Sequence, residues 1–306
     1  MPASRVVLTG SSGRLGRALA ERFRTNGLDV FGIDRTEGDK STPTLVADLS
    51  DEQSVAAVLR PDDVVVHVAS MHGFSGAAID QGGLPDQAYL DLNAAGTWHL
   101  YNAMATAGVR RVILTSTVGV LGHIPEKRLS TIRLGERYPS YGIYGTTKRF
   151  QEDTAESFAE LRGISTLAIR PPAFVSVDPI RDVYLRAVGA LDLEDVVGIH
   201  AAAASAAFDG RVLAEPSSFE AVFATQPLPY TEADEPLLEF PDGRLRLVER
   251  YWPGSREWFD AHGFRPDDGL DIPVWVFDSE PAERRLGWRA ANTFDAWYRA
   301  NVQKDA

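Results

Sequence analysis

The fold of this chain is decided near its start, by the stretch Val6-Val7-Leu8-Thr9-Gly10-Ser11-Ser12-Gly13-Arg14-Leu15-Gly16. A short apolar run stops at a glycine-rich turn, and a helical pattern follows from Gly13 to Thr25. Glycines let a backbone turn tightly and approach a pyrophosphate, and the amides that open a helix bind anions. The stretch therefore predicts a strand, a phosphate-binding turn and a helix; a tight turn without a ligand is the alternative interpretation.

The same alternation continues through the first half of the chain. The apolar runs predict these strands: Arg5–Thr9, Asp29–Asp34, Thr44–Val46, Val64–Ala69, Arg111–Ser116 and Ser165–Arg170. The stretches of helical period between them are Gly13–Thr25, Asp51–Leu59, Tyr89–Ala107 and Tyr144–Leu161. Strands that alternate with helices predict a doubly wound, Rossmann-like α/β fold with a parallel sheet covered on both faces.

The alternation breaks after Pro171-Pro172, where the chain becomes rich in Pro, Trp and acidic residues. We expect a dinucleotide-binding domain over residues 1–175, to which residues 192–225 return. Residues 176–191 and 226–306 are expected to form a smaller substrate-binding lobe.

Asp34 ends the second strand, where a carboxylate accepts hydrogen bonds from adenosine ribose hydroxyls. Because an acid there repels a 2′-phosphate, the sequence favours NAD over NADP. Arg35 and Arg14 lie close enough in the sequence to bind a 2′-phosphate, so NADP remains an alternative. Arg35 is equally well explained as a solvated residue.

Composition excludes several classes of function. The chain has 306 residues and a formal charge of −12, which disfavours nucleic acid and anionic membranes as partners. It contains no cysteine, so disulfides and thiolate metal sites are ruled out, and its six histidines lack metal-ligand spacing. No signal peptide or apolar run of spanning length is evident. We expect a cytoplasmic protein without a metal site.

Tyr144-Gly-Thr-Thr-Lys148 places a phenol and an ammonium on one face of a predicted helix. A free phenol has a pKa of about 10, too high for efficient proton transfer at neutral pH. A neighbouring lysine cation favours the phenolate, so we expect Lys148 to lower the pKa of Tyr144. Tyr141 is the rival phenol, but Gly145 stands four residues after it. A chance pair on a structural helix is the other interpretation.

Taken in order, these motifs resemble the extended short-chain dehydrogenases/reductases, and more narrowly their NAD-dependent epimerase/dehydratase branch. The resemblance covers Val6 to Pro172 and the ending Phe277–Trp288. The motifs that carry it are the glycine loop, Asp34, Asp48-Leu49, His67-Val-Ala-Ser70, Asn93-Ala-Ala-Gly96-Thr97, Ser116-Thr117, Tyr144 with Lys148, and Arg170-Pro171.

The resemblance implies roles for individual residues. Thr117 would hold the substrate oxygen, Tyr144 would exchange its proton, and Lys148 would also hold the nicotinamide ribose. The residues implied to bind or border the cofactor are Gly10, Ser12, Gly13, Arg14, Leu15, Gly16, Asp34, Arg35, Asp48, Leu49, Val68, Ala69, Ser70, Asn93, Ser116, Tyr144, Lys148 and Pro171. Asn93 is equally well explained as a buried structural residue. The resemblance also implies a homodimer formed by the helices near Tyr89–Ala107 and Tyr144–Leu161.

The substrate is indicated less directly. Relatives that act on nucleotide sugars commonly carry an asparagine after the Arg-Pro strand end, but Ala173 follows Arg170-Pro171-Pro172 here. The spacing is more similar to that of uronate dehydrogenases. A sugar acid needs a cation for its carboxylate, for which Arg181 and Arg186 are candidates, and His72 is a candidate substrate contact. Solvated arginines and an incidental histidine are the alternatives.

Three functions are therefore weighed. The first is an NAD(P)-dependent dehydrogenase that moves a hydride between the nicotinamide and a secondary carbinol or carbonyl of a sugar-like or sugar-acid molecule. The second is a nucleotide-sugar epimerase or dehydratase that reduces NAD only transiently. The third is a non-catalytic NAD(P)-binding sensor, which an intact Thr117, Tyr144 and Lys148 set disfavours.

Overall fold

The computed structural model describes residues 4–72, 84–122, 128–140, 142–174, 179–264 and 274–303. The chain divides into two compact units. The first contains residues 1–123, 137–170 and 199–222, and the second contains residues 124–136, 171–198 and 223–306. Each unit is described by itself.

A seven-stranded sheet forms the centre of the first unit, with the order β3-β2-β1-β4-β5-β7-β8. Its strands are β1 (Arg5–Thr9), β2 (Asp29–Asp34), β3 (Thr44–Val46), β4 (Val64–His67), β5 (Arg111–Thr115), β7 (Ser165–Arg170) and β8 (Phe219–Phe223), the last of which ends at the unit boundary. The pairs from β3 through β7 are parallel. The predicted doubly wound parallel sheet is confirmed.

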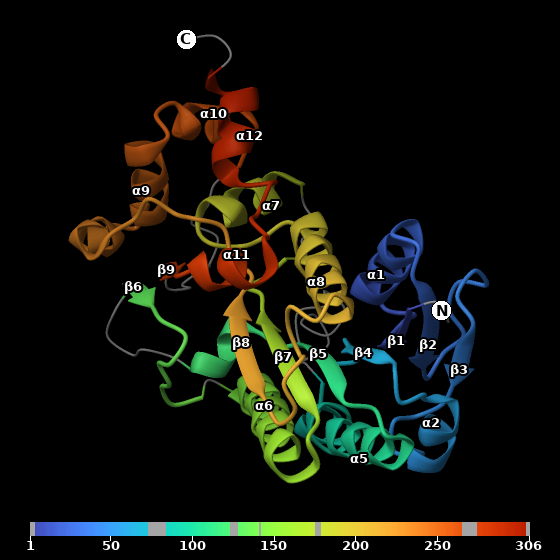
Figure 1. Ribbon diagram of the computed structural model, residues 1–306. Coiled ribbons are helices and arrows are strands. Elements are labelled where there is room, and N and C mark those ends of the chain that lie inside the picture. Colours follow the sequence, from blue (N-terminus) through green and yellow to red (C-terminus); the bar gives the residue numbers. More distant parts are fainter. Residues whose placement is uncertain are drawn as a thin grey trace. The chain divides into compact units, whose positions relative to one another are not determined.

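Helices cover both faces of this sheet, α1 on one face and α2, α5 and α6 on the other (Figure 1). The helices of the unit are α1 (Arg14–Thr25), α2 (Glu52–Val58), α4 (Asp86–Tyr89), α5 (Thr97–Ala107), α6 (Gly142–Arg162) and the part of α8 (Leu193–Phe208) that starts at Ile199. A π-helical turn, Leu90–Gly96, joins α4 to α5, and a 3₁₀ turn, Val118–Leu121, follows β5.

The strands read as apolar runs because both faces of the sheet are buried. Val6 and Val7 point to opposite faces, and neither is exposed to solvent. The core on the side of α2, α5 and α6 is filled by aliphatic and aromatic side chains such as Val7, Leu100, Tyr101 and Phe158. The order of the strands reverses between β1 and β4, and the carboxyl ends of these strands are where ligands bind in such sheets.

The second unit has its own core, which contains Tyr184, Tyr230, Trp252, Phe259 and Phe294. Its elements are the parallel pair β6 (Leu129–Ile132) and β9 (Val274–Phe277), the helices α7 (Pro179–Ala187), α9 (Gly243–Tyr251), α10 (Ser255–Ala261), α11 (Glu280–Leu286) and α12 (Phe294–Asn301), the start of α8, and a 3₁₀ segment, Glu232–Glu239.

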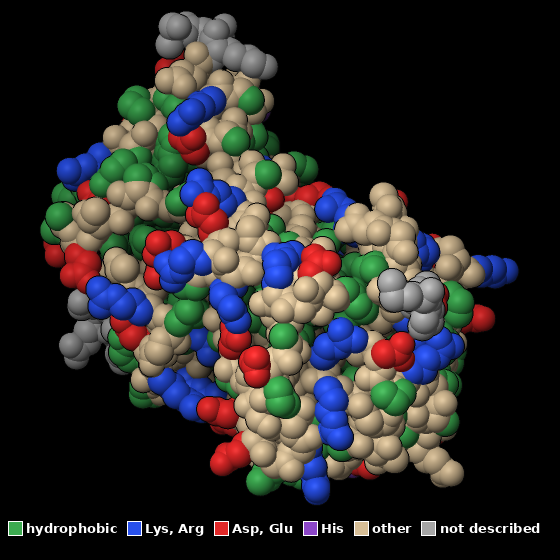
Figure 2. Space-filling model, in the orientation of Figure 1, with side chains coloured by type: hydrophobic (Ala, Val, Ile, Leu, Met, Phe, Trp, Pro, Cys, Tyr) green, Lys and Arg blue, Asp and Glu red, His purple; other side chains and the backbone are tan. Residues whose placement is uncertain are grey.

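Acidic and basic side chains are interspersed over the face seen in Figure 2. In the part of the chain that the structure describes, no helix is long and apolar enough to cross a membrane.

Candidate active site

Tyr144 and Lys148 lie one turn apart on α6, at the carboxyl end of the sheet. Tyr144 is half-buried and Lys148 is only 2% exposed. The buried face of α6 carries further polar residues, Gln151 and Glu152, at helical spacing from this pair. A polar stripe on the buried face of a helix indicates a site rather than ordinary core packing.

Thr117 follows β5 and lies beside Tyr144. Its Oγ1 accepts a hydrogen bond from the Gly119 amide at 3.1 Å, which caps the short 3₁₀ turn. The Thr117 side chain also lies close enough to the Tyr144 phenol to act on its pKa, and this interaction by itself lowers the pKa of Tyr144. The structure therefore brings together two of the three residues expected to be catalytic.

The pKa of Tyr144 does not follow the expectation. Burial raises it to about 12, because the phenolate loses its hydration, and the Thr117 interaction offsets this only in part. The expectation that Lys148 lowers this pKa is wrong for the chain by itself. The Lys148 ammonium instead donates to the Thr115 carbonyl oxygen at 2.7 Å and to Gln151 Oε1. Burial also lowers the pKa of Lys148, to about 7, against the opposing charge of Glu152.

Ser116 belongs to a buried network that sequence reasoning missed. Its hydroxyl donates to Glu152 Oε1 at 2.5 Å, and Arg170 binds both oxygens of the same carboxylate. The Ser116 hydroxyl therefore donates its one proton to another residue of the protein, Glu152. The available signal was the position of Glu152, two helical turns after Tyr144 on the buried face of α6.

The glycine loop fits the pyrophosphate of a dinucleotide. Gly10 has a φ of +70°, and a Cβ there would lie 2.8 Å from the Ala69 backbone. A Cβ on Gly16 would lie 2.1 Å from the Gly10 carbonyl oxygen. Gly13, which has no side chain, is the N-cap of α1, so the amides of the first helical turn face the loop. The buried Ser11 Oγ lacks a hydrogen-bond partner among the described residues.

Asp34 lies beside this loop at the carboxyl end of β2. Its Oδ2 accepts from the Ser12 amide at 2.9 Å, and its Oδ1 accepts from the Thr36 amide at 3.0 Å. Arg35 is exposed next to it. The carboxylate is held in the place where the resemblance puts the ribose contact.

Asp48 and Leu49 follow β3, the former exposed and the latter buried. Asp48 accepts hydrogen bonds from the amide and hydroxyl of Ser50, and the amide bond is the main reason that its pKa is lowered. The pair lies at the same edge of the sheet as Asp34, since β3 is parallel to β2.

Asn93 holds the segment after β4 in place. It sits in the π-helical turn and is fully buried. Its amide nitrogen donates to the Met71 carbonyl oxygen and to Thr147 Oγ1, and its oxygen accepts from the Met71 amide and the Ser70 hydroxyl. These contacts support the half-buried stretch 68–70 and the helix α6. A single wide turn of this kind often marks a functional site.

The candidate substrate residues belong to both units, His72 to the first and Arg181 and Arg186 to the second. His72 is exposed, although partial desolvation of its ring and the charge of Lys148 both lower its pKa. In the second unit, Arg181 is exposed and Pro171 is buried. The rival phenol Tyr141 lies outside the described residues. Among the described residues, no group of three or more His, Asp or Glu side chains is arranged to hold a metal ion.

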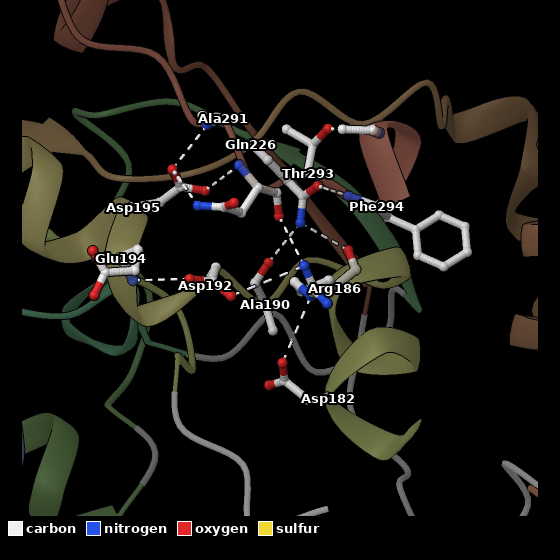
Figure 3. Close-up of polar contacts among 12 residues, drawn as sticks. Asp182, Arg186, Ala190, Asp192, Glu194, Asp195, Gln226, Ala291, Thr293 and Phe294 are labelled. Carbon is white, nitrogen blue, oxygen red and sulfur yellow. Dashed lines mark hydrogen bonds and ion pairs between the residues drawn. The ribbon is translucent and has the colours of Figure 1, made fainter. Parts of the chain in front are cut away.

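Arg186 lies among carboxylates of the second unit, as Figure 3 shows. Its guanidinium is 3.6 Å from Asp182 and 4.0 Å from Asp192, and it donates to the Asn292 carbonyl oxygen. Two acids offset its charge, which weakens its case as the cation for a substrate carboxylate.

Comparison with known proteins agrees with this geometry. The model of the NAD dependent epimerase/dehydratase family matches residues 6–183, more than half of the chain. This chain belongs to that family. A uronate dehydrogenase from Pseudomonas syringae pv. tomato is 30% identical over 174 residues, which are 55% of this chain and 59% of that protein.

Solved structures share the fold over nearly the whole chain. The UDP-glucose 4-epimerase from Brucella ovis, in complex with NAD, has a TM-score of 0.69 at 18% identity and 97% coverage of both chains. A glucuronic acid dehydrogenase from Chromohalobacter salexigens has a TM-score of 0.65 at 17% identity, covering 99% of this chain and 90% of the other. The stretches matched in three uronate dehydrogenases cover 59 to 60% of their lengths.

Proposed function

We propose that this protein is an NAD-dependent oxidoreductase that moves a hydride between the nicotinamide and a secondary carbinol or carbonyl of a sugar acid. The observation that carries the proposal is that Tyr144 and the buried Lys148 lie one turn apart on α6, with Thr117 beside the phenol and the Lys148 ammonium bonded to the Thr115 carbonyl oxygen at the end of β5. The three groups share the carboxyl edge of the sheet with the glycine loop, in a family described as NAD-dependent. Hydride acceptance is the chemistry that NAD supplies when it is bound.

Tyr144 is the acid and base of the proposal. Burial keeps the phenol protonated at neutral pH, which is the form that donates to a carbonyl oxygen, but efficient transfer needs positive charge beside it to bring its pKa down. Oxidation of a carbinol needs the phenolate, which positive charge stabilises. Lys148 is the nearby cation for that direction, and Thr117 holds the oxygen that gains or loses the proton.

The glycine loop and the strand ends are proposed to hold the dinucleotide. Gly10, Gly13 and Gly16 admit the pyrophosphate, while Asp34 and Asp48 would hold the adenosine. The carboxylate of Asp34 disfavours a 2′-phosphate, so NAD is the proposed cofactor rather than NADP. The other residues that the resemblance implies keep their proposed cofactor contacts.

A sugar acid is the proposed substrate because relatives named uronate dehydrogenase match the chain. The second unit is proposed to bind it, with Arg181 and Arg186 as the candidates for its carboxylate, although Asp182 and Asp192 offset part of the charge of Arg186. A cytoplasmic location stays a prediction.

The test is incubation of the protein with NAD or NADP and a panel of uronates, aldoses, polyols and nucleotide sugars, while absorbance of reduced nicotinamide is followed. We expect NADH in proportion to an oxidised uronate. Tyr144→Phe should lower kcat by at least about a hundredfold while the Kd for NAD stays nearly unchanged. The matched control is Tyr89→Phe, since the rings of Tyr89 and Tyr144 are neighbours whose centroids lie 6.5 Å apart. A sugar product that changes without NADH, or a fully active Tyr144→Phe, contradicts the proposal.

A homodimer is proposed as the assembly. The helices α5 and α6 pack side by side in the first unit. Their outer sides expose large apolar residues: Trp98 is 44% exposed, Phe150 43% and Leu161 72%. Apolar area of this kind on neighbouring helices favours cover by a second copy of the chain.

A further inference from the structure

A chain of buried hydrogen bonds begins at the Lys148 ammonium. The Nζ atom donates to the Thr115 carbonyl oxygen at 2.7 Å and to the side chain of Gln151. An ammonium only donates, so the Gln151 atom that faces it must be the amide oxygen. This fixes the orientation of the Gln151 amide, and the two acceptors use two of the three N–H bonds of Lys148.

The chain continues from Gln151 to Thr97. Gln151 Nε2 donates to Thr97 Oγ1 at 2.7 Å, and the Thr97 hydroxyl donates to the Asn93 carbonyl oxygen at 2.7 Å. A hydroxyl has one proton and two lone pairs. Because the Thr97 hydroxyl donates its one proton to Asn93, any other group within hydrogen-bond distance of its oxygen must be the donor.

That donor is His67. Its Nε2 lies 2.9 Å from Thr97 Oγ1, so Nε2 carries the ring proton. Its Nδ1 then accepts from the Thr9 hydroxyl at 2.7 Å, and Thr9 Oγ1 in turn accepts from the amides of Val68 and Ala69. His67 is fully buried, and burial, aided by the charge of Lys148, lowers its pKa to about 3, as a neutral ring requires.

We propose that Gln151 is a positioning residue for Lys148, and that Thr97 and His67 hold its amide in the one orientation that accepts from the ammonium. These hydrogen bonds link the end of β1, next to the glycine loop, to the helix α6, and donation from both sides converges on Thr97 Oγ1. They couple the segment that admits the dinucleotide to the residue that the proposed function places beside Tyr144. The role of Lys148 in catalysis rests on the proposed function, whereas its positioning by Gln151 rests on the hydrogen bonds alone.

Several titratable or charged groups face Lys148. Glu152 and Arg170 form an ion pair on one side, His67 and His72 come from β4 and the segment after it, and Tyr144 precedes Lys148 on α6. Gln151 differs from all of these because it stabilises the ammonium without bringing a charge. Its replacement by Met removes the acceptor at similar volume, and its replacement by Glu adds a negative charge.

The test reads the titration of Lys148 directly. The sequence has four lysines, Lys40, Lys127, Lys148 and Lys304, so a protein labelled with carbon-13 at the lysine ε carbons gives few NMR signals. Loss of one signal in Lys148→Arg assigns it. We expect a wild-type midpoint near 7, a midpoint lower by at least about 0.5 unit in Gln151→Met, and a higher midpoint in Gln151→Glu.

Thr97→Val supplies a second variant of nearly equal shape. It keeps the Gln151 acceptor but removes the hydroxyl that orients the amide, so its midpoint should shift in the direction of Gln151→Met by a smaller amount. Equal midpoints in the wild type and all three folded variants would overturn the proposal, and so would a lower midpoint in Gln151→Glu.

Kinetics separate this inference from the proposed function. Gln151→Met should lower kcat about tenfold with KM nearly unchanged, and Gln151→Glu should recover part of that loss. Equal kcat in the wild type and Gln151→Met would contradict a positioning role. Absence of turnover by the wild type with any sugar would refute the proposed function. The NMR midpoints of the wild type and the variants would still test whether Gln151 positions Lys148.

Discussion

Glu152 of α6 and Arg170 of β7 form a bidentate ion pair inside the first unit. Arg170 Nε donates to Glu152 Oε1 at 3.0 Å, and Arg170 Nη2 donates to Glu152 Oε2 at 2.7 Å. Both residues are less than 10% exposed. Ser116 adds a third hydrogen bond to the same carboxylate. The pair fastens the helix that bears Tyr144 and Lys148 to the end of a strand.

Removing one partner of this pair should destabilise the protein strongly. Glu152→Leu leaves the Arg170 guanidinium buried without its carboxylate, which costs about 3–5 kcal/mol of the free energy of unfolding. Urea denaturation measures the loss. The double variant Glu152→Leu with Arg170→Met should recover most of it, because the guanidinium that lost its carboxylate is then removed as well.

The matched control is the exposed pair Arg137–Asp153, whose side chains are 57% and 51% exposed. Asp153→Ala, one residue along the same helix, should cost less than about 1 kcal/mol, since water screens that pair. Similar losses in the two single variants would contradict a special role for burial.

Much of the fold was predictable because local patterns determine it. The bounds of β1, β2, β3 and β7 agree with the predicted ones, since each strand is a short apolar run bounded by turn or charged residues. The pair β6 and β9 was not predicted. Each strand has four residues, and the partners lie far apart in the sequence, so no local pattern marks them.

One predicted helix is interrupted. The stretch Tyr89–Ala107 reads as a continuous helix, but the structure has a π-helical turn at Leu90–Gly96. The buried Asn93 amide makes its bonds to Met71 and Thr147 from this turn, and these partners are distant in sequence. Spacing alone contains no information about them.

The site was predictable as a set of residue types but not in its electrostatics. The spacing of Tyr144 and Lys148 correctly placed them one helical turn apart on α6. The direction of the Tyr144 pKa depends on desolvation, and the sequence does not show how deeply a side chain is buried.

The glycine loop offers a second prediction. A methyl group at Gly16 would lie 2.1 Å from the Gly10 carbonyl oxygen, so Gly16→Ala must displace the turn that faces the pyrophosphate. We expect the Kd for NAD to rise at least about tenfold, or 1.4 kcal/mol, in a fluorescence titration. In Gly135→Ala, the control, the added carbon meets no atom of the described residues within 4 Å. Unchanged NAD affinity in Gly16→Ala would refute a cofactor role for this loop.

Acid should destabilise the protein through His67. Its pKa falls from 6.5 to about 3 on folding, so below pH 6.5 the unfolded chain binds a proton that the folded chain does not. The stability that a neutral His67 provides is therefore complete above pH 6.5 and is lost as the pH falls towards 3. The loss approaches about 1.4 kcal/mol per pH unit within that window.

Urea denaturation of the wild type and of His67→Gln across this pH range measures the effect. The variant should show a flatter dependence on pH, whatever its stability at neutral pH. Parallel curves for the wild type and His67→Gln would show that His67 does not contribute.

The proposed dimer is tested at the exposed faces of α5 and α6. A stable interface buries about 1,200–2,000 Å² of surface, and a charge at its centre has no partner there. Trp98→Glu and Phe150→Glu should each shift the sedimenting species from twice 33.4 kDa to 33.4 kDa. Phe240→Glu is the control, because Phe240 is 48% exposed but belongs to the second unit. A wild-type protein that sediments as a monomer at all concentrations contradicts the dimer. Dissociation by Phe240→Glu as well would mean that the helices α5 and α6 are not its specific interface.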